Sequence, residues 1–169
     1  MPEKKTIERA HQDKQEGKSP STQAGEFVRE EMHHIREGKH GARSTQQAIA
    51  IGLSKARRSG VKLQPPKRGK TSPQARAQAK RDLRKGQASR KRKPSTTRSR
   101  AVSRALKREG HSAASPKSLS RQARRSAQER GSASLRQAAI KAVQTKGKAA
   151  LKRAARKAVH TRARRRQAA

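Results

Sequence analysis

The sequence contains no cysteine, tryptophan or tyrosine, and Phe27 is its only aromatic residue. The absence of cysteine excludes disulfides, thiolate zinc sites and cysteine nucleophiles. The near absence of aromatic rings excludes the base-stacking surfaces on which single-strand-binding proteins and RNA-recognition sheets depend. Any contact with nucleic acid must therefore be made mainly to phosphate.

Large apolar side chains are also scarce, since Leu, Ile, Val and Phe together number 18 among 169 residues. Folded domains contain about 20 % of these residues, so burial cannot offset the ordering entropy over most of this chain. No apolar run approaches the roughly 18 residues of a membrane helix. We therefore expect extensive disorder, a location in a soluble compartment and no membrane partner.

Acidic residues are few and unevenly placed. Lys and Arg number 47 against 11 Asp and Glu, and eight of the eleven acids fall within residues 1–37. The net charge is near −1 for residues 1–37 and +37 for residues 38–169. A segment with so little counter-charge gains free energy when it displaces small cations from a phosphate backbone, so nucleic acid is the first candidate partner.

The composition divides the chain into four parts. Residues 1–20 form a polar N-terminal arm, 21–63 a helical hairpin, 64–71 a linker of Pro, Gly and Lys, and 72–169 a basic tail of Ala, Arg, Lys and Ser. The predicted class is all-α, with a short hairpin and a long basic tail that is largely disordered or loosely helical.

The hairpin prediction depends on helical spacing and on end signals. A first helix is expected over about 23–37, ended by Gly38, and a second begins at Ser44 and ends before Gly60. The predicted core of the hairpin consists of Phe27, Val28, Ile35, Ile49 and Leu53. Such a core is small, so a second copy of the chain is a candidate partner through the hairpin.

The tail combines helix-forming residues with strong charge repulsion. Ser72-Pro73 and Ser115-Pro116 are typical helix starts. However, like charges lie four residues apart, for example Lys148 and Lys152, and oppose helix formation until they are neutralised. We therefore expect coil in the free tail and helix on nucleic acid.

One polar cluster could suggest metal chemistry. Glu31 and His34 lie three residues apart beside Glu30, His33 and Glu37, a spacing found in di-iron helical bundles. Such sites need further ligands and a large apolar bundle, and only His40 is near. The sequence therefore predicts an exposed polar helix face, with no metal and no cofactor. No nucleophile elbow or phosphate-binding glycine loop occurs, so we expect no enzyme activity.

Two stretches carry a resemblance to known proteins. They are residues 21–31, Ser-Thr-Gln-Ala-Gly-Glu-Phe-Val-Arg-Glu-Glu, and residues 47–54, Gln-Ala-Ile-Ala-Ile-Gly-Leu-Ser, followed by Lys-Ala-Arg-Arg. Over roughly residues 1–66 the chain resembles small basic bacterial proteins with a domain of unknown function, often labelled DNA-binding or plasmid stabilisation proteins. The tail resembles histone-like basic tails in composition. The resemblance implies a bacterial cytoplasmic setting and no catalytic residue.

These features predict a non-catalytic, sequence-tolerant DNA-binding protein of the nucleoid or of plasmid maintenance. Duplex DNA is the favoured partner, with RNA as an alternative. The expected phosphate-binding residues are Arg57, Arg58, Lys67, Arg68, Arg90, Lys91, Arg92, Lys93, Arg124, Arg125, Lys152, Arg153, Arg164, Arg165 and Arg166. Two other functions stay open: a protein-interaction or antitoxin-like module of a plasmid stabilisation system, and an RNA- or ribosome-associated basic protein.

Overall fold

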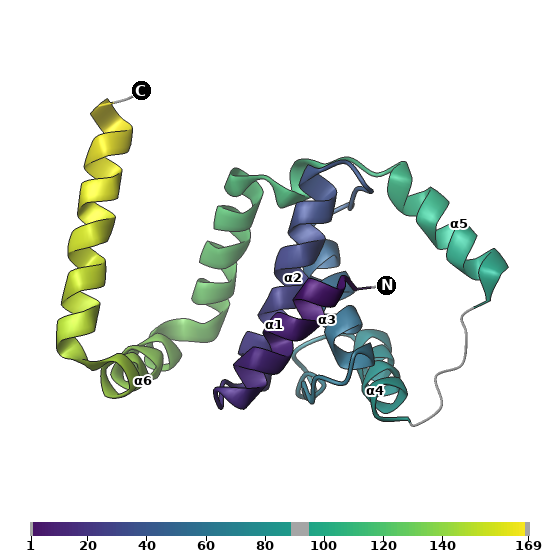
Figure 1. The fold of residues 1–169 in the computed structure, drawn as a ribbon, viewed down its shortest axis with the longest axis horizontal. Coiled ribbons are helices and arrows are strands. Elements are labelled where there is room, and N and C mark those ends of the chain that lie inside the picture. Colours follow the sequence, from purple (N-terminus) through teal and green to yellow (C-terminus); the bar gives the residue numbers. More distant parts are fainter. Residues whose placement is uncertain (1, 89–94, 168–169) are drawn as a thin grey trace. The chain divides into compact units, whose positions relative to one another are not determined.

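The computed structural model describes residues 2–88 and 95–167, and all the regular elements in these ranges are helical. They are α1 (Lys4–Gln15), α2 (Pro20–Arg36), α3 (Thr45–Arg58), α4 (Pro73–Gln87), α5 (Thr96–Lys107), the 3-10 helix η1 (Ser112–Ala114) and α6 (Pro116–Gln167) (Figure 1). The predicted all-α class is confirmed for these residues. The chain divides into two units, the first ending at Gln122 and the second beginning at Ala123.

Serine caps explain where most of the helices begin. At each of five helix starts a serine Oγ accepts a hydrogen bond from the backbone N–H three residues later. The five are Ser19, Ser44, Ser72, Ser95 and Ser115. At three of them proline is the first helical residue, where its missing N–H costs nothing and its fixed φ suits the helix.

The predicted hairpin is present as α2 and α3, and the two helices run antiparallel. Ala24 near the start of α2 shares an apolar cluster with Phe27 and with Ala56 near the end of α3, and Ile35 near the end of α2 shares another with Ala48. The helices approach closely at Gly52, where an added Cβ would lie 2.7 Å from Val28 Cα. Phe27 and Ile35 are buried, while Val28, Ile49 and Leu53 pack on the clusters from partly buried positions.

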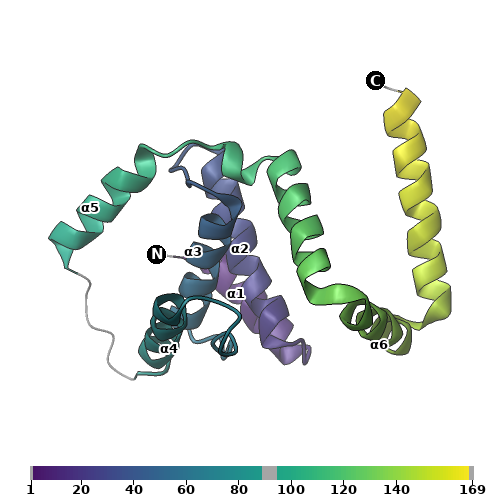
Figure 2. The ribbon, with the colours of Figure 1, turned by 180° about the vertical axis from the view of Figure 1, so that it is seen from behind.

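The N-terminal segment predicted as a polar arm contains a helix packed on α2. Helix α1 lies beside α2 in both views (Figure 2). Ala10 is buried in the cluster of Phe27, and Ile7 packs against the same cluster. Two apolar side chains three residues apart therefore suffice to cover one end of the hairpin.

Part of the predicted tail also belongs to the first folded unit. Helix α4 packs on α3 and buries Ala79. Further along, η1 buries Ala113 and Ala114 in the cluster that contains Ile35 and Ala48. The apolar faces of the hairpin, for which a second copy was a candidate partner, are thus covered by α1, α4 and η1 of the same chain.

A backbone contact fixes the segment before η1 to the loop that joins α2 and α3. The N–H of Gly41 donates to Leu106 O at 2.9 Å, and the N–H of Ala42 donates to Gly110 O at 3.0 Å. A Cβ at position 41 would lie 1.9 Å from Glu109 O, so the contact requires glycine there. The folded unit therefore reaches well past the predicted linker at 64–71.

The structure does not show the largely disordered tail that the composition predicted. From Pro116 to Gln167 the chain is helical, interrupted at Gly131 and Gly147, which both have φ of 74°. Leu119, in the first turn of α6, packs on the cluster of Ile35, and beyond it the high intrinsic helix propensity of alanine and arginine favours helix without a buried face. None of the helices in the described ranges is long and apolar enough to cross a membrane.

Candidate functional site

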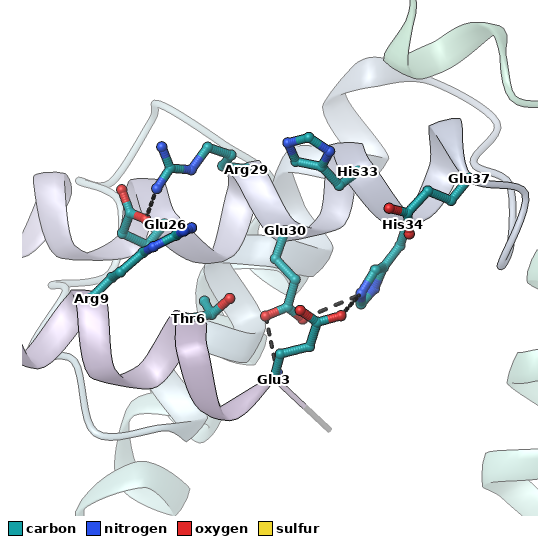
Figure 3. Close-up of a pocket in the computed structure, with 9 residues that line it drawn as sticks. All are labelled: Glu3, Thr6, Arg9, Glu26, Arg29, Glu30, His33, His34 and Glu37. Atoms are coloured by element: carbon teal, nitrogen blue, oxygen red, sulfur yellow. Dashed lines mark hydrogen bonds and ion pairs between the residues drawn. The ribbon is translucent and has the colours of Figure 1, made fainter.

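A small polar pocket lies between α1 and α2 (Figure 3). Its volume is about 120 Å³. Its lining residues are Glu3, Thr6, Arg9, Glu26, Arg29, Glu30, His33, His34 and Glu37. Charged side chains of both signs dominate this list, so the pocket suits a small polar or ionic ligand better than an apolar one.

Glu3 closes one end of the pocket and joins the start of α1 to α2. Its backbone N–H donates to Glu30 Oε2 at 3.1 Å, and its Oε1 lies 2.9 Å from His34 Nε2 (Figure 3). Lys39 Nζ donates to the same Oε1 at 3.4 Å. The hydrogen bond from His34, and then the one from Lys39, hold the pKa of the Glu3 carboxyl below its ordinary value.

Glu31 lies next to this pocket and is completely buried. Lys55 Nζ of α3 is 2.6 Å from its Oε2 and also 3.5 Å from Glu30 Oε1. His40 Nε2 is 3.3 Å from its Oε1. Neither carboxylate oxygen has a partner with hydrogen-bond geometry, so ion pairing alone compensates this buried side chain.

The structure brings Glu31, His34 and His40 together. One ligand atom from each of these residues lies within 4.8 Å of the others. The sequence predicted an exposed polar face here, and this is wrong for Glu30 and Glu31, which are 5 % and 0 % exposed. His33 and Glu37 are exposed as predicted. The pattern of a single helix could not show that α1, α3 and the loop at 37–44 cover its acidic side.

Arg57 is one of the predicted phosphate-binding residues. The structure corrects this prediction, because Arg57 is only 7 % exposed. Its Nε donates to Leu63 O at 3.2 Å, which holds the chain after α3 against the helix. Burial lowers the pKa of its guanidinium, and the charge of Asp82 opposes that shift. Arg57 is therefore a structural residue of the first unit.

Asp82 of α4 is another buried acid, and the sequence analysis did not single it out. It accepts hydrogen bonds from Ser54 Oγ at 2.8 Å and Gln78 Nε2 at 3.0 Å, and Arg58 Nε lies 4.0 Å away. The contacts with Ser54 and Arg58 join α4 to α3. The sequence signal for this site was an isolated acid in a strongly basic segment.

The other predicted basic residues lie on the surface wherever the structure describes their side chains. They are Arg58, Lys67, Arg68, Arg124, Arg125, Lys152, Arg153, Arg164 and Arg166. Arg90, Lys91, Arg92 and Lys93 lie outside the described residues, as does the side chain of Arg165. The exposed residues come from α3, the segment after it and α6.

The few acids of the basic part all have partners or are buried. Besides Asp82, Glu109 pairs with Arg43 at 3.3 Å and Glu129 pairs with Arg125 at 2.8 Å. Residues 123–167 contain 15 Lys and Arg and only that one acid, Glu129. None of the side chains described in this second unit is buried, so its positive charge is presented to solvent.

These features define the class of protein: an all-helical chain with a partly buried Glu/His/Lys cluster in one unit and exposed basic helix in the other. Residues 18–68 match a family described as a family of unknown function (DUF6496). The match supports the predicted domain of unknown function, and carries no DNA-binding or plasmid label. No curated protein and no solved structure matches the chain.

Proposed function

We propose that the protein binds nucleic acid without sequence preference, through phosphate contacts of exposed Lys and Arg side chains. The observation that carries the proposal is the composition and exposure of the second unit. It contains 15 basic residues and a single acid, and none of its described side chains is buried. Lys and Arg side chains in this number, with so few carboxylates to compete for them, release many counterions from a nucleic acid when they contact its phosphate backbone.

Charge spacing in α6 supports the same partner. Lys148, Lys152 and Arg156 follow one another at intervals of four residues, and so do Arg153 and Lys157. Like charges at this spacing repel along a helix, and phosphates between them turn the repulsion into attraction. Duplex DNA is the favoured partner because it carries one negative charge per about 1.7 Å of its axis, twice the density of a single one of its strands.

The first unit then serves as a folded anchor for the basic helix. In a bacterial cell this arrangement suits a non-catalytic protein of the nucleoid or of plasmid maintenance. The N-terminal acids do not oppose binding strongly, because buried Glu30 and Glu31 are already paired with Lys55.

Salt-dependent binding of duplex DNA and of structured RNA tests the proposal. We expect a log–log slope of about −8 if roughly nine basic groups contact phosphates. A chain ending at Gln122, where the first unit ends, should bind far more weakly and with a shallower slope. Tighter binding of RNA than of duplex DNA at equal salt would redirect the proposal to an RNA-associated protein.

A pair of matched variants separates charge from helix formation. Replacing Lys152, Arg153, Arg156 and Lys157 by Gln removes four positive charges from exposed positions of α6. We expect the slope to become shallower by about 3 to 4. Replacing Ala149, Ala150, Ala154 and Ala155 by Gln keeps the charge and should leave the slope unchanged. A full-chain slope shallower than about −3 would rule out phosphate-led binding.

A further inference from the structure

We propose that Glu31, His34 and His40 form a binding site for one divalent transition-metal ion, with Zn²⁺ as the best match. Two imidazoles and one carboxylate are a common ligand set for zinc, and they leave a fourth position for water or another ligand. The three donors come from α2 and from the loop that follows it. This site is independent of nucleic-acid binding, because it uses none of the proposed phosphate-binding residues.

The spacing of the donors suits a small ion after modest side-chain movement. His40 Nε2 and Glu31 Oε1 are 3.3 Å apart, about the separation of two ligands on a tetrahedral zinc with bonds near 2.0–2.1 Å. All three ligand atoms lie within 4.8 Å of one another. A rotation that moves the His34 ring by about 1 Å or more would complete the set.

The hydrogen bond of His40 to the backbone leaves its other ring nitrogen, the one that could bind a metal, facing a carboxylate. Nδ1 lies 3.1 Å from Gly41 O, and a carbonyl can only accept, so Nδ1 carries the hydrogen. In neutral imidazole Nε2 then carries a lone pair, and this lone pair faces the buried Glu31 Oε1. Two acceptors at this distance repel unless a cation lies between them, and that cation is either a proton on His40 or a metal ion.

His34 is held in the same manner by its outer nitrogen. Nε2 lies 2.9 Å from the Glu3 carboxylate, so Nε2 donates, and the lone pair is on Nδ1, which lies 4.0 Å from Glu30 Oε1 (Figure 3). Histidine ligands usually donate their second N–H to a carboxylate or a backbone carbonyl, which fixes the tautomer and strengthens the ligand. Glu3 and Gly41 O supply these two kinds of partner to His34 and His40.

The charges around the site accept an added cation. Glu3, Glu30, Glu31 and Glu37 contribute four carboxylates, and Lys39 and Lys55 contribute two ammonium groups. Lys55 contacts Oε2 of Glu31 and leaves Oε1, on the His40 side, for monodentate ligation. A divalent ion changes the sum of these charges from −2 to 0.

Titration of the full chain, freed of nucleic acid, with Zn²⁺ and with Co²⁺ tests the proposal. We expect one ion per chain and a four-coordinate Co²⁺ absorption spectrum. His34→Gln and His40→Gln should weaken binding by at least about 100-fold, and Glu3→Gln, which removes only an orienting partner, by about 10-fold. His33→Gln is the matched control, since it removes an exposed histidine from the same helix and should change affinity less than about 2-fold.

Folding is checked by far-UV circular dichroism before each titration, and Zn²⁺ should raise the unfolding temperature of the wild-type chain. If a variant does not fold, imidazole NMR of the wild type decides, because Zn²⁺ should shift the signals of His34 and His40 and leave His33 in place. Binding of no ion by the folded chain, equal loss of affinity in His33→Gln, or six-coordinate Co²⁺ would each overturn the proposal.

Discussion

At the scale of single residues, Glu3 links the pH dependence of stability to the docking of α1. The fold lowers the pKa of Glu3 from its ordinary 4.5, chiefly through the hydrogen bond from His34. A carboxyl whose pKa is lowered stabilises the fold fully above 4.5, and this contribution is lost as the pH falls through the lowered pKa. We expect Glu3→Gln to lower the unfolding temperature at pH 6.

The difference in unfolding temperature between the wild type and Glu3→Gln should narrow as the pH is lowered from 4.5 to 3. In this range the wild type loses the stabilisation from ionised Glu3, which the variant lacks at every pH. Other acids titrate in this range, and the difference between the two proteins isolates Glu3. Glu8→Gln, at an exposed acid of the same helix, should not reproduce this pH dependence. A gap that is constant with pH would contradict the assigned role of Glu3.

Two glycines provide a matched test of the α2–α3 contact. At Gly52 an added Cβ would meet the backbone of Val28 at 2.7 Å, whereas at Gly25 it would meet nothing within 4 Å. Overpacking costs about 1–3 kcal/mol, and replacing glycine in a helix by alanine returns about 0.5–1 kcal/mol. Denaturant unfolding should therefore show a loss on the order of 1 kcal/mol for Gly52→Ala and a gain for Gly25→Ala. A gain at both positions would mean that the helices do not meet at Gly52.

At the scale of elements, η1 is a short segment that completes the core of the hairpin. Ala114 is 0 % exposed, and Arg36 Nε donates to its carbonyl at 2.9 Å. Ala114→Arg would place a charge in an apolar cluster, so we expect a loss of at least about 2 kcal/mol in denaturant unfolding. Ala133→Arg introduces the same side chain at an exposed helical position and should cost less than about 0.5 kcal/mol. Equal effects would show that η1 is not docked.

Elements defined by local signals could be predicted from the sequence, and elements defined by distant contacts could not. The hairpin is marked by Ser44, Gly38 and helical spacing, which all act within a few residues. The docking of η1 depends on two alanines in a segment rich in alanine, and nothing local distinguishes Ala113 and Ala114 from their neighbours.

The same reasoning applies to the candidate site. The sequence drew attention to Glu31, His34 and His40 but predicted an exposed face. Burial of Glu31 depends on Lys55 and on the return of the loop that carries His40, and both are properties of the folded hairpin. Arg57 was misplaced for a related reason, because its carbonyl partner Leu63 belongs to a segment that folds back on α3.

At the scale of the whole molecule, the buried core lies in the first unit, whereas the second unit has the higher positive charge per residue. All the buried residues among those that the structure describes lie in the first unit, and the last of them is Ala114. A chain ending at Gln122 should therefore unfold cooperatively, within a few degrees of the full chain when both are measured at high salt. High salt screens the repulsion that the second unit adds to the full chain. A much lower unfolding temperature for the shorter chain would show that the second unit supports the first.

The burial of Phe27 has a practical consequence for following this fold. Phe27 is the only aromatic residue and is 1 % exposed, in the cluster where Ala10, Ala56 and Val61 meet. Uniform incorporation of fluorophenylalanine would label this one position without any mutation. A single fluorine resonance would then report whether α1 and α3 are docked, and it could be recorded beside nucleic acid, which contributes no fluorine signal.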